Sequence, residues 1–202
     1  MEKKSVLMGA VPGVALAIFL VLAVPGSAFV SSQTAEAFPV HGYVTVSVMR
    51  DGNEIYHHED HNVITVVGQD FIRGQIGATT GLGTNGANYI GLSTNTNDED
   101  ATDTCLSTTV AGTTSAEITT NGLARSQGDY AEVSTDQFTI TETFTATGTH
   151  TDVQKAGLFT AAANGDTCAG SNDGIMMAEN TFTSVSLANN DQLTITWTIT
   201  LS

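Results

Sequence analysis

The sequence predicts a mainly β protein: a single antiparallel β-sandwich, jelly-roll or immunoglobulin-like, with one short helix and a hydrophobic leader helix at its N-terminus. Residues 193–201 alternate apolar side chains with threonines, and a period of two is typical of a strand with one buried face. Other short apolar or alternating segments are separated by turns rich in Gly, Asn and Asp, as in β-sandwiches. Residues 38–202 are enough for one domain.

Residues 1–37 have the pattern of a secretory signal peptide. A short basic region precedes the apolar run 6–24, and small residues at Ala28 and Ala37 offer cleavage sites. The run is also long enough to span a bilayer if it is not cleaved, so an N-terminal anchor is the alternative. Both interpretations place the remaining domain outside the cell or at its surface, and after cleavage we expect no membrane association.

The charge distribution excludes one class of partner. The formal net charge is −15 at pH 7, and the basic residues beyond the leader are only Arg50, Arg73, Arg125 and Lys155. A nucleic-acid-binding protein needs a basic surface to neutralise phosphates, so we expect no nucleic-acid partner. An acidic surface also keeps a protein soluble and repels anionic membranes.

A hairpin and a short helix are expected at the start of the domain. Residues 42–49 alternate valines with other side chains, and the Asp-Gly pair at 51–52 is a strong turn signal leading to a second strand over residues 54–65. Over residues 65–76 the apolar side chains fall at roughly helical spacing, and Thr65 can cap the N-terminus of that helix.

Short strands alternate with loops in the rest of the chain. The segment 137–149 has one apolar face and one face of threonines, but Glu142 falls on the apolar face and predicts a bulge, an edge or an inward charge. Segments dominated by Gly, Thr, Asn and Asp are expected to be loops. The predicted strands are 89–93, 118–124, 130–133, 137–149, 153–163, 175–178, 181–187 and 193–201. For residues 153–163 a helical turn is the alternative, and Gly157 favours the strand.

The segment His57-His58-Glu59-Asp60-His61 is the best candidate for a transition-metal site. On a strand, His57, Glu59 and His61 share one face, where they form a partial site for zinc or copper, with His150 as a candidate outside ligand. Structural zinc normally needs a complete ligand set at firm spacing. The alternative is therefore a solvated polar strand.

The loop at residues 95–104 is rich in oxygen ligands. Calcium binds through several such oxygens, and extracellular proteins use it to stiffen loops. The loop lacks the glycine and the terminal glutamate of an EF-hand, so a solvated acidic turn is the alternative. The candidate calcium ligands are Asn95, Asn97, Asp98 and Asp100, with Glu99 and Asp103 in the same loop.

Cys105 and Cys168 are predicted to lie in loops and to form a disulfide, because an exported chain meets oxidising surroundings. Two free thiols are the alternative. Neither cysteine has a neighbouring histidine or basic residue, no serine has a nucleophile-elbow context, and no pair of carboxylates is marked out. We therefore expect that the protein is not an enzyme and has no firm cofactor.

These features together resemble the organisation of β-sandwich subunits of prokaryotic extracellular filaments, such as archaeal threads and bundling pili and bacterial biofilm-matrix fibres. The shared features are a signal peptide, one Thr-rich domain and an extended segment, Phe38–Met49, directly after the leader. The resemblance implies a homopolymer assembled by strand donation. The donated strand would bury Val40, Val44, Val46 and Val48 in a neighbouring subunit, whereas a hairpin within one subunit is the alternative.

Two other functions remain open at this level. A secreted monomeric module could bind a glycan or a metal through the histidine segment or the acidic loop. A virion structural protein is the third possibility, since residues 62–65 with Gly68, and residues 89–94, resemble structural modules of tailed viruses.

Overall fold

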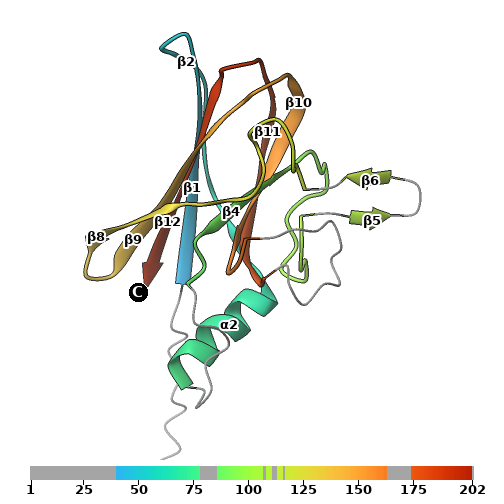
Figure 1. Cartoon of the computed structure of the whole chain (residues 1–202). Coiled ribbons are helices and arrows are strands. Elements are labelled where there is room, and N and C mark those ends of the chain that lie inside the picture. The colour runs from blue at the N-terminus through green and yellow to red at the C-terminus, as the bar shows by residue number, and fades with distance from the viewer. Residues whose placement is uncertain are drawn as a thin grey trace, which may run out of the picture. The chain divides into compact units, whose positions relative to one another are not determined.

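The structure, a computed structural model, describes residues 40–77, 86–106, 108–110, 113–115, 117–162 and 174–201. These residues form two five-stranded antiparallel sheets, a two-stranded sheet and one short helix (Figure 1). The predicted fold class, a mainly β sandwich with one short helix, is confirmed. The predicted leader lies outside the described residues, so its cleavage stays a prediction.

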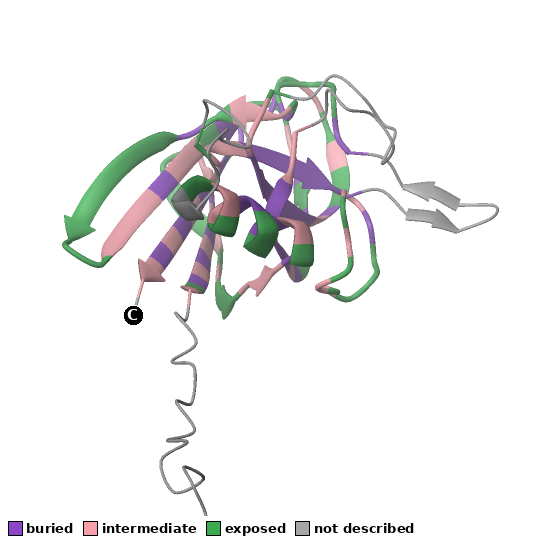
Figure 2. Cartoon of the chain, turned by 90° about the horizontal axis from the view of Figure 1, so that it is seen from below, coloured by how far each residue is buried: buried purple, intermediate pink, exposed green. Residues whose placement is uncertain are grey.

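The first sheet has the strand order β2-β1-β12-β9-β8. β1 and β12 pair along nearly their whole lengths, from Val40 opposite Leu201 to Met49 opposite Gln192. Their ribbons alternate between buried and intermediate residues (Figure 2), because successive side chains of a strand point to opposite faces. The strand bounds are Val40–Arg50 for β1, Asn53–His61 for β2, Asp129–Ser134 for β8, Gln137–Thr145 for β9 and Gln192–Leu201 for β12.

The second sheet has the strand order β3-β11-β10-β4-β7. Its central pair, β10 and β11, is antiparallel with several register shifts. The strand bounds are Val63–Ile64 for β3, Tyr89–Ser93 for β4, Ser126–Gln127 for β7, His150–Phe159 for β10 and Met176–Leu187 for β11. A separate small sheet pairs β5, Thr108–Val110, with β6, Thr113–Ser115, and these two strands were not predicted.

One apolar core lies between the two large sheets. Val46 and Trp197 from the first sheet and Leu158 from the second are fully buried members of the same cluster. A smaller cluster of Phe159, Leu106 and Met176 includes the β10 neighbour of Leu158. Because neighbouring strand residues point to opposite faces, this smaller cluster lies on the outer face of the second sheet.

The predicted turn between the first two strands is confirmed. Asp51 and Gly52 both have positive φ angles, 50° and 78°. Two consecutive residues of this kind are the requirement of a type I′ turn, whose twist matches that of the flanking strands. The Asp-Gly pair therefore sets the antiparallel pairing of β1 with β2.

The long strand predicted over residues 54–65 is interrupted at Asn62. Residues before it belong to β2 in the first sheet and residues after it belong to β3 in the second. The Asn62 backbone N–H donates to the carbonyl of Gly42 at 3.2 Å. A Cβ atom on Gly42 would lie 1.7 Å from the Asn62 side chain, so Gly42 leaves the space that this side chain occupies at the crossing between the sheets.

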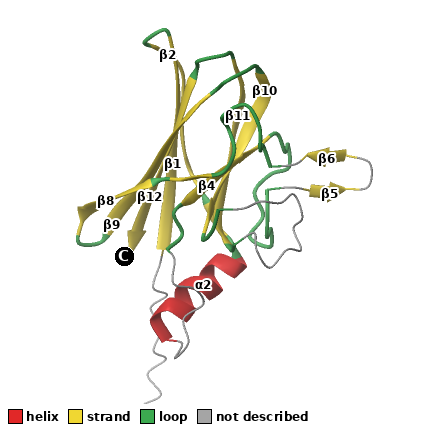
Figure 3. Ribbon diagram, in the orientation of Figure 1, coloured by secondary structure: helices red, strands yellow, loops and turns green. Residues whose placement is uncertain are grey.

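The predicted helix is present as α2, Val66–Gly77 (Figure 3). Thr65 caps it as expected, because its Oγ1 accepts the Gly68 N–H at 3.0 Å. The same hydroxyl donates to the carbonyl of Met176 at 2.5 Å. A Cβ on Gly68 would lie 2.2 Å from the Met177 carbonyl oxygen, so the first turn of α2 packs closely on β11.

Several predicted strands differ from those in the structure, and the strand predicted over 137–149 ends at Thr145. The segment 118–124 is not a strand in the structure: Glu117 forms an isolated bridge with Ser93, and residues 121–122 form a turn with positive φ angles. The segments 175–178 and 181–187 are one strand, β11, because both edges of this strand are paired and Asn180 is buried within it. The strand predicted over 153–163 begins earlier and ends at Phe159.

The position of Glu142 excludes one of the three explanations for a charge on an apolar face. β9 pairs with β12 without a register shift, and Glu142 lies opposite the buried Ile195, so there is no bulge here. On its other side β9 pairs with β8 only as far as Thr141, so Glu142 lies just beyond the end of that pairing. Glu142 is therefore a partly exposed charge on the apolar face, at the point where β9 becomes an edge among the described residues.

Candidate functional site

β8 is an edge strand of the first sheet. The sheet order ends at β8, so within the described residues its second edge has no strand partner. All six of its residues are exposed (Figure 2), and these include Tyr130 at 62% and Val133 at 56%. The ring centroids of Tyr130 and Phe138 lie 5.5 Å apart. An exposed edge with apolar side chains is a template for pairing with another strand.

An apolar groove of about 480 Å³ lies beside this edge. Tyr130 and Phe138 form one wall, α2 contributes another, and the ends of β1 and β12 also line it. None of the residues that line it is charged, so the groove suits an apolar occupant. The lining residues are Val40, Phe71, Ile72, Gln75, Gly86, Ala87, Asn88, Tyr130, Phe138, Ile140, Met177, Ile199 and Leu201.

The valines predicted to form a donated strand lie in their own sheet in this single chain. Val44, Val46 and Val48 are fully buried, and β1 is paired on both sides, with β12 and with β2. Val40 lies at the start of β1 and lines the groove. Donation of β1 in trans stays a prediction. In this sheet Val46→Asp would place an unpaired carboxylate in the subunit's own core, so this variant cannot separate folding from assembly.

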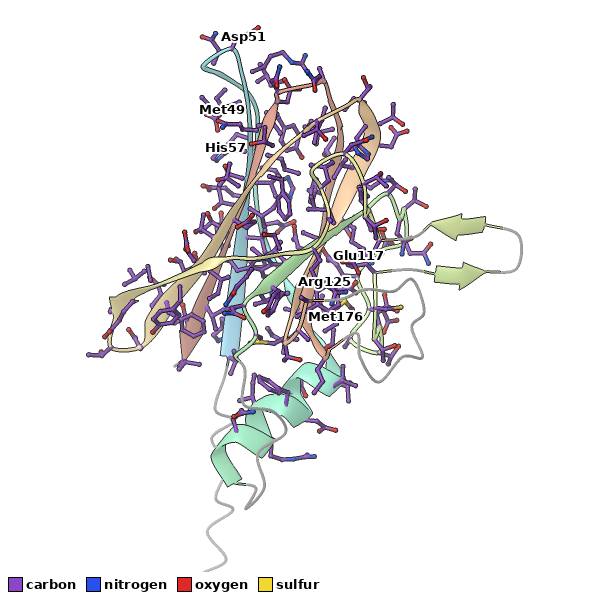
Figure 4. All side chains as sticks on the ribbon, viewed as in Figure 1. Met49, Asp51, His57, Glu117, Arg125 and Met176 are labelled. Atoms are coloured by element: carbon purple, nitrogen blue, oxygen red, sulfur yellow. The ribbon has the colours of Figure 1, made fainter. Side chains whose placement is uncertain are left out.

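The histidine segment forms β2, the opposite edge of the first sheet. The register places His57, Glu59 and His61 opposite Ser47, Thr45 and Tyr43, which confirms that the three candidate ligands share one face. Figure 4 shows His57 near the tip of this hairpin, on the side of Asp51. The ring of His61 contacts that of Tyr43, with the centroids 5.5 Å apart.

The side chains on this face are already paired with one another. His57 Nδ1 lies 2.9 Å from Glu54 Oε1 and its Nε2 lies 3.2 Å from Glu59 Oε1. Hydrogen bonds to Glu54 and then to Glu59 raise the pKa of His57. Hydrogen bonds from Tyr43 and His57 lower the pKa of Glu59. The face is therefore a small exposed network of opposite charges.

The candidate outside ligand, His150, and the neighbouring His58 lie away from this face. His58 is on the other face of β2, with its ring 6.2 Å from that of Phe182. His150 begins β10 in the second sheet, opposite Leu187. Among the described residues, no group of three or more His, Cys, Asp or Glu side chains is arranged to hold a metal ion. Zinc or copper binding by His57, Glu59 and His61 stays a prediction.

Side chains of the acidic loop form hydrogen bonds with nearby backbone groups. Asn95 is buried, its Nδ2 donates to the Leu106 carbonyl at 3.0 Å, and its Oδ1 accepts the Asn97 N–H at 2.9 Å. Asp100 Oδ1 accepts the Thr102 N–H at 2.8 Å, and this bond lowers the pKa of Asp100. These hydrogen bonds stabilise the loop. Calcium binding by Asn95, Asn97, Asp98 and Asp100 stays a prediction.

The loop is also attached to the outer face of the second sheet. Glu179, fully buried on β11, accepts the Asp100 N–H at 2.7 Å through Oε1. Glu99 Oε1 accepts the N–H of Thr181, two residues along the same strand. Burial raises the pKa of Glu99. The acidic loop therefore packs on the second sheet and covers part of its outer face, and it is not a freely solvated turn.

Beneath this cover lies Lys155, which is fully buried. Its Nζ is 2.9 Å from Glu179 Oε2 and 3.7 Å from Asp103 Oδ2. Burial raises the pKa of Glu179 in spite of the opposing effect of Lys155. One feature of the sequence indicates this site. Lys155 is the single lysine beyond the leader, and it falls within an otherwise apolar strand pattern.

A second buried ion pair joins Arg125 to Glu117 (Figure 4). Arg125 donates to both carboxylate oxygens, from Nε at 2.7 Å and from Nη2 at 2.5 Å, and its Nη1 donates to the Ala161 carbonyl at 3.1 Å. Its guanidinium carbon lies 3.4 Å from the centroid of the Phe159 ring. These contacts hold the segment around residues 117–125 against the sheet.

Cys105 is disulfide-bonded. It lies in a bend at the end of the acidic loop, where the sequence predicted a loop. Cys168 is the only other cysteine of the chain and lies outside the described residues. The Cys105–Cys168 pairing therefore stays a prediction.

Comparison with protein-family models, with curated proteins and with solved structures gives no match for this chain. Within the described residues, no helix is long and apolar enough to cross a membrane.

Proposed function

We propose that the chain is a self-associating structural subunit of an extracellular filament or surface coat, assembled by β-strand complementation. The observation that carries the proposal is the open edge of β8 lying directly beside the apolar groove. A strand that adds to this edge would gain main-chain hydrogen bonds to β8, and the groove would accept its apolar side chains. The two features together form an acceptor site.

The donor that we assign is the segment at residues 29–39 of a second copy. This segment lies between the candidate cleavage site at Ala28 and the start of β1, so the assignment requires cleavage at Ala28 rather than at Ala37. It carries a single charge, Glu36. The assignment differs from donation of β1 itself. Removal of β1 from its sheet would break two ladders of hydrogen bonds and expose three buried valines, whereas donation of the preceding segment would leave both of these ladders in place.

A donor at one end of the chain and an acceptor elsewhere on the domain give a heterologous interface. Such an interface is not closed by a twofold axis, so it leads to rings or open filaments. The net charge of −15 opposes nonspecific association between subunits. Specific assembly therefore needs a local apolar site, and the groove, which has no charged lining residue, meets that requirement.

The test mixes two variants that are each defective in one half of the interface. The first lacks residues 29–39 and keeps the acceptor. The second carries Tyr130→Asp with Val133→Asp, two exposed positions on β8, and keeps the donor. We expect each variant alone to stay monomeric in sedimentation velocity, and an equimolar mixture to form dimers but no longer species.

Ile55→Asp is the matched control, because Ile55 is an exposed apolar residue, 47% accessible, on the opposite edge strand β2. This variant should form filaments like the wild type in electron micrographs. Loss of assembly in Ile55→Asp alone would move the interface to β2. A wild-type protein that remains monomeric at high concentration across pH and salt would reject the proposal and favour the secreted monomeric binding module.

A further inference from the structure

We propose that Lys155 and Asp103 become joined by an intramolecular amide bond, with Glu179 as the proton-transfer group. The three side chains come from β10, the acidic loop and β11. Lys155 Nζ lies between the two carboxyl groups, 2.9 Å from Glu179 Oε2 and 3.7 Å from Asp103 Oδ2. The inference does not depend on the assembly interface, since none of these residues lines the groove.

The burial of the site favours this chemistry. Lys155 and Glu179 are fully buried, and a buried ion pair bears a large desolvation cost. Transfer of one proton from Nζ to Glu179 Oε2 replaces two charges by a neutral amine and a neutral acid. The raised pKa of Glu179, which burial causes, favours the protonated acid. A neutral amine is the nucleophile that amide formation requires.

The two carboxyl groups are placed for different roles. Both oxygens of Glu179 are occupied, Oε1 by the Asp100 N–H and Oε2 by Lys155 Nζ, so its carboxyl group is held in place beside the amine. Asp103 is 30% exposed, and it lies on the loop rather than on a strand. It can therefore move the short distance to the amine and release a water molecule to solvent.

The reaction is balanced without any other reactant. The Nζ lone pair of the neutral amine forms a bond to Cγ of the Asp103 carboxylate, the ion-pair partner of Lys155. Glu179 donates the proton it took from Nζ to one oxygen of that carboxyl group, then accepts a second proton from the nitrogen and passes it to the same oxygen, so the Cγ–O bond breaks and water leaves. The products are one secondary amide, one water and Glu179 as the carboxylate, and no atom is oxidised or reduced.

The consequence is a covalent link between the acidic loop and the centre of the second sheet. The loop is already attached there by the bonds of Glu179 to the Asp100 N–H and of Glu99 to the Thr181 N–H. An amide would make this attachment permanent and would remove the buried ion pair. It would also consume the single lysine beyond the leader.

Because Lys155 is the single lysine beyond the leader, the test can be made on wild-type protein. The full chain is denatured, its cysteines are reduced and alkylated, and its amines are labelled before or after digestion with trypsin. We expect no label at Lys155, no cleavage after it, and residues 74–125 joined to residues 126–202 with the loss of one water. Quantitative recovery of a labelled Lys155 would overturn the proposal, and a link from Lys155 to Glu179 would overturn the assignment of Asp103.

Variants assign the roles of the two carboxyl groups. Asp103→Ala should free Lys155 for labelling completely, because the acyl group is gone. Glu179→Gln should also leave Lys155 free, whereas Glu99→Gln, a matched change in the same loop, should retain the link. Fluorescence of the single, fully buried Trp197 shows whether each variant is folded. A link that still forms in folded Glu179→Gln would overturn the role of Glu179.

Discussion

The hydroxyl of Thr65 is predicted to hold α2 against the second sheet, and Thr65→Val tests this. The side chain is fully buried, its Oγ1 accepts the Gly68 N–H at 3.0 Å, and it donates to the Met176 carbonyl at 2.5 Å. Valine keeps the branched shape and removes the oxygen. The loss of the cap costs about 1 kcal/mol, and the buried carbonyl left without its partner costs about 1 kcal/mol more.

The expected change in the free energy of unfolding is therefore about 2 kcal/mol, or about 4–8 °C in Tm for a domain of this size. Thr65→Ser is the matched control, because it keeps both hydrogen bonds and removes only one methyl group, at a cost of about 1 kcal/mol. Urea unfolding followed by Trp197 fluorescence measures both variants. The expected order of stability is Thr, then Ser, then Val.

The order of the two variants decides between hydrogen bonding and packing. If the methyl group rather than the hydroxyl were the important part of Thr65, the Val variant would be more stable than the Ser variant. That result would refute the argument. The position matters for the proposed interface as well, because α2 contributes Phe71 and Ile72 to the groove.

Three further predictions concern charges, metals and cysteines. Hydrogen bonds from Arg50 lower the pKa of Asp191, so this pair contributes stability that is present above the unfolded pKa near 4 and is lost as the pH falls through the lower folded pKa. Asp191→Asn should therefore lower the free energy of unfolding by about 1 kcal/mol at neutral pH, a figure that allows for the partial exposure of Arg50. The difference between the variant and the wild type should vanish in acid. A difference that stays constant at every pH would contradict this prediction. His57→Ala with His61→Ala should abolish any zinc or copper uptake that calorimetry detects, and the absence of saturable uptake by the wild type would exclude the metal site. Alkylation of the folded protein without reductant should modify neither Cys105 nor Cys168, and two modified thiols would disprove their pairing.

Local sequence patterns were sufficient to predict much of the fold. The alternation over residues 193–201 gave the bounds of β12 closely, the Asp51-Gly52 pair gave the hairpin, and Thr65 gave the start of α2. Each of these features depends on neighbouring residues in the chain. Side-chain direction in a strand, positive φ angles in a turn and a hydroxyl at a helix N-terminus all act within a few positions.

The features on which the functional argument depends were decided by tertiary structure. The sequence favoured strand over residues 62–65 but could not show that the chain changes sheets at Asn62, because residues 63–64 pair with β11, which is distant in the chain. The groove is built from α2, β8, β9 and the ends of β1 and β12.

The charged residues also divide into a feature that the sequence determines and one that the tertiary structure decides. The sequence by itself determined that the domain is acidic and has one lysine beyond its leader. Its strand pattern did not show that this lysine is buried, since the residues that enclose it come from other segments. Glu179 lies 24 positions away and Asp98 57 positions away along the chain. A lysine loses its water only when such distant groups close over it, so the burial and chemistry of Lys155 were decided by the packing of the acidic loop on β10 and β11.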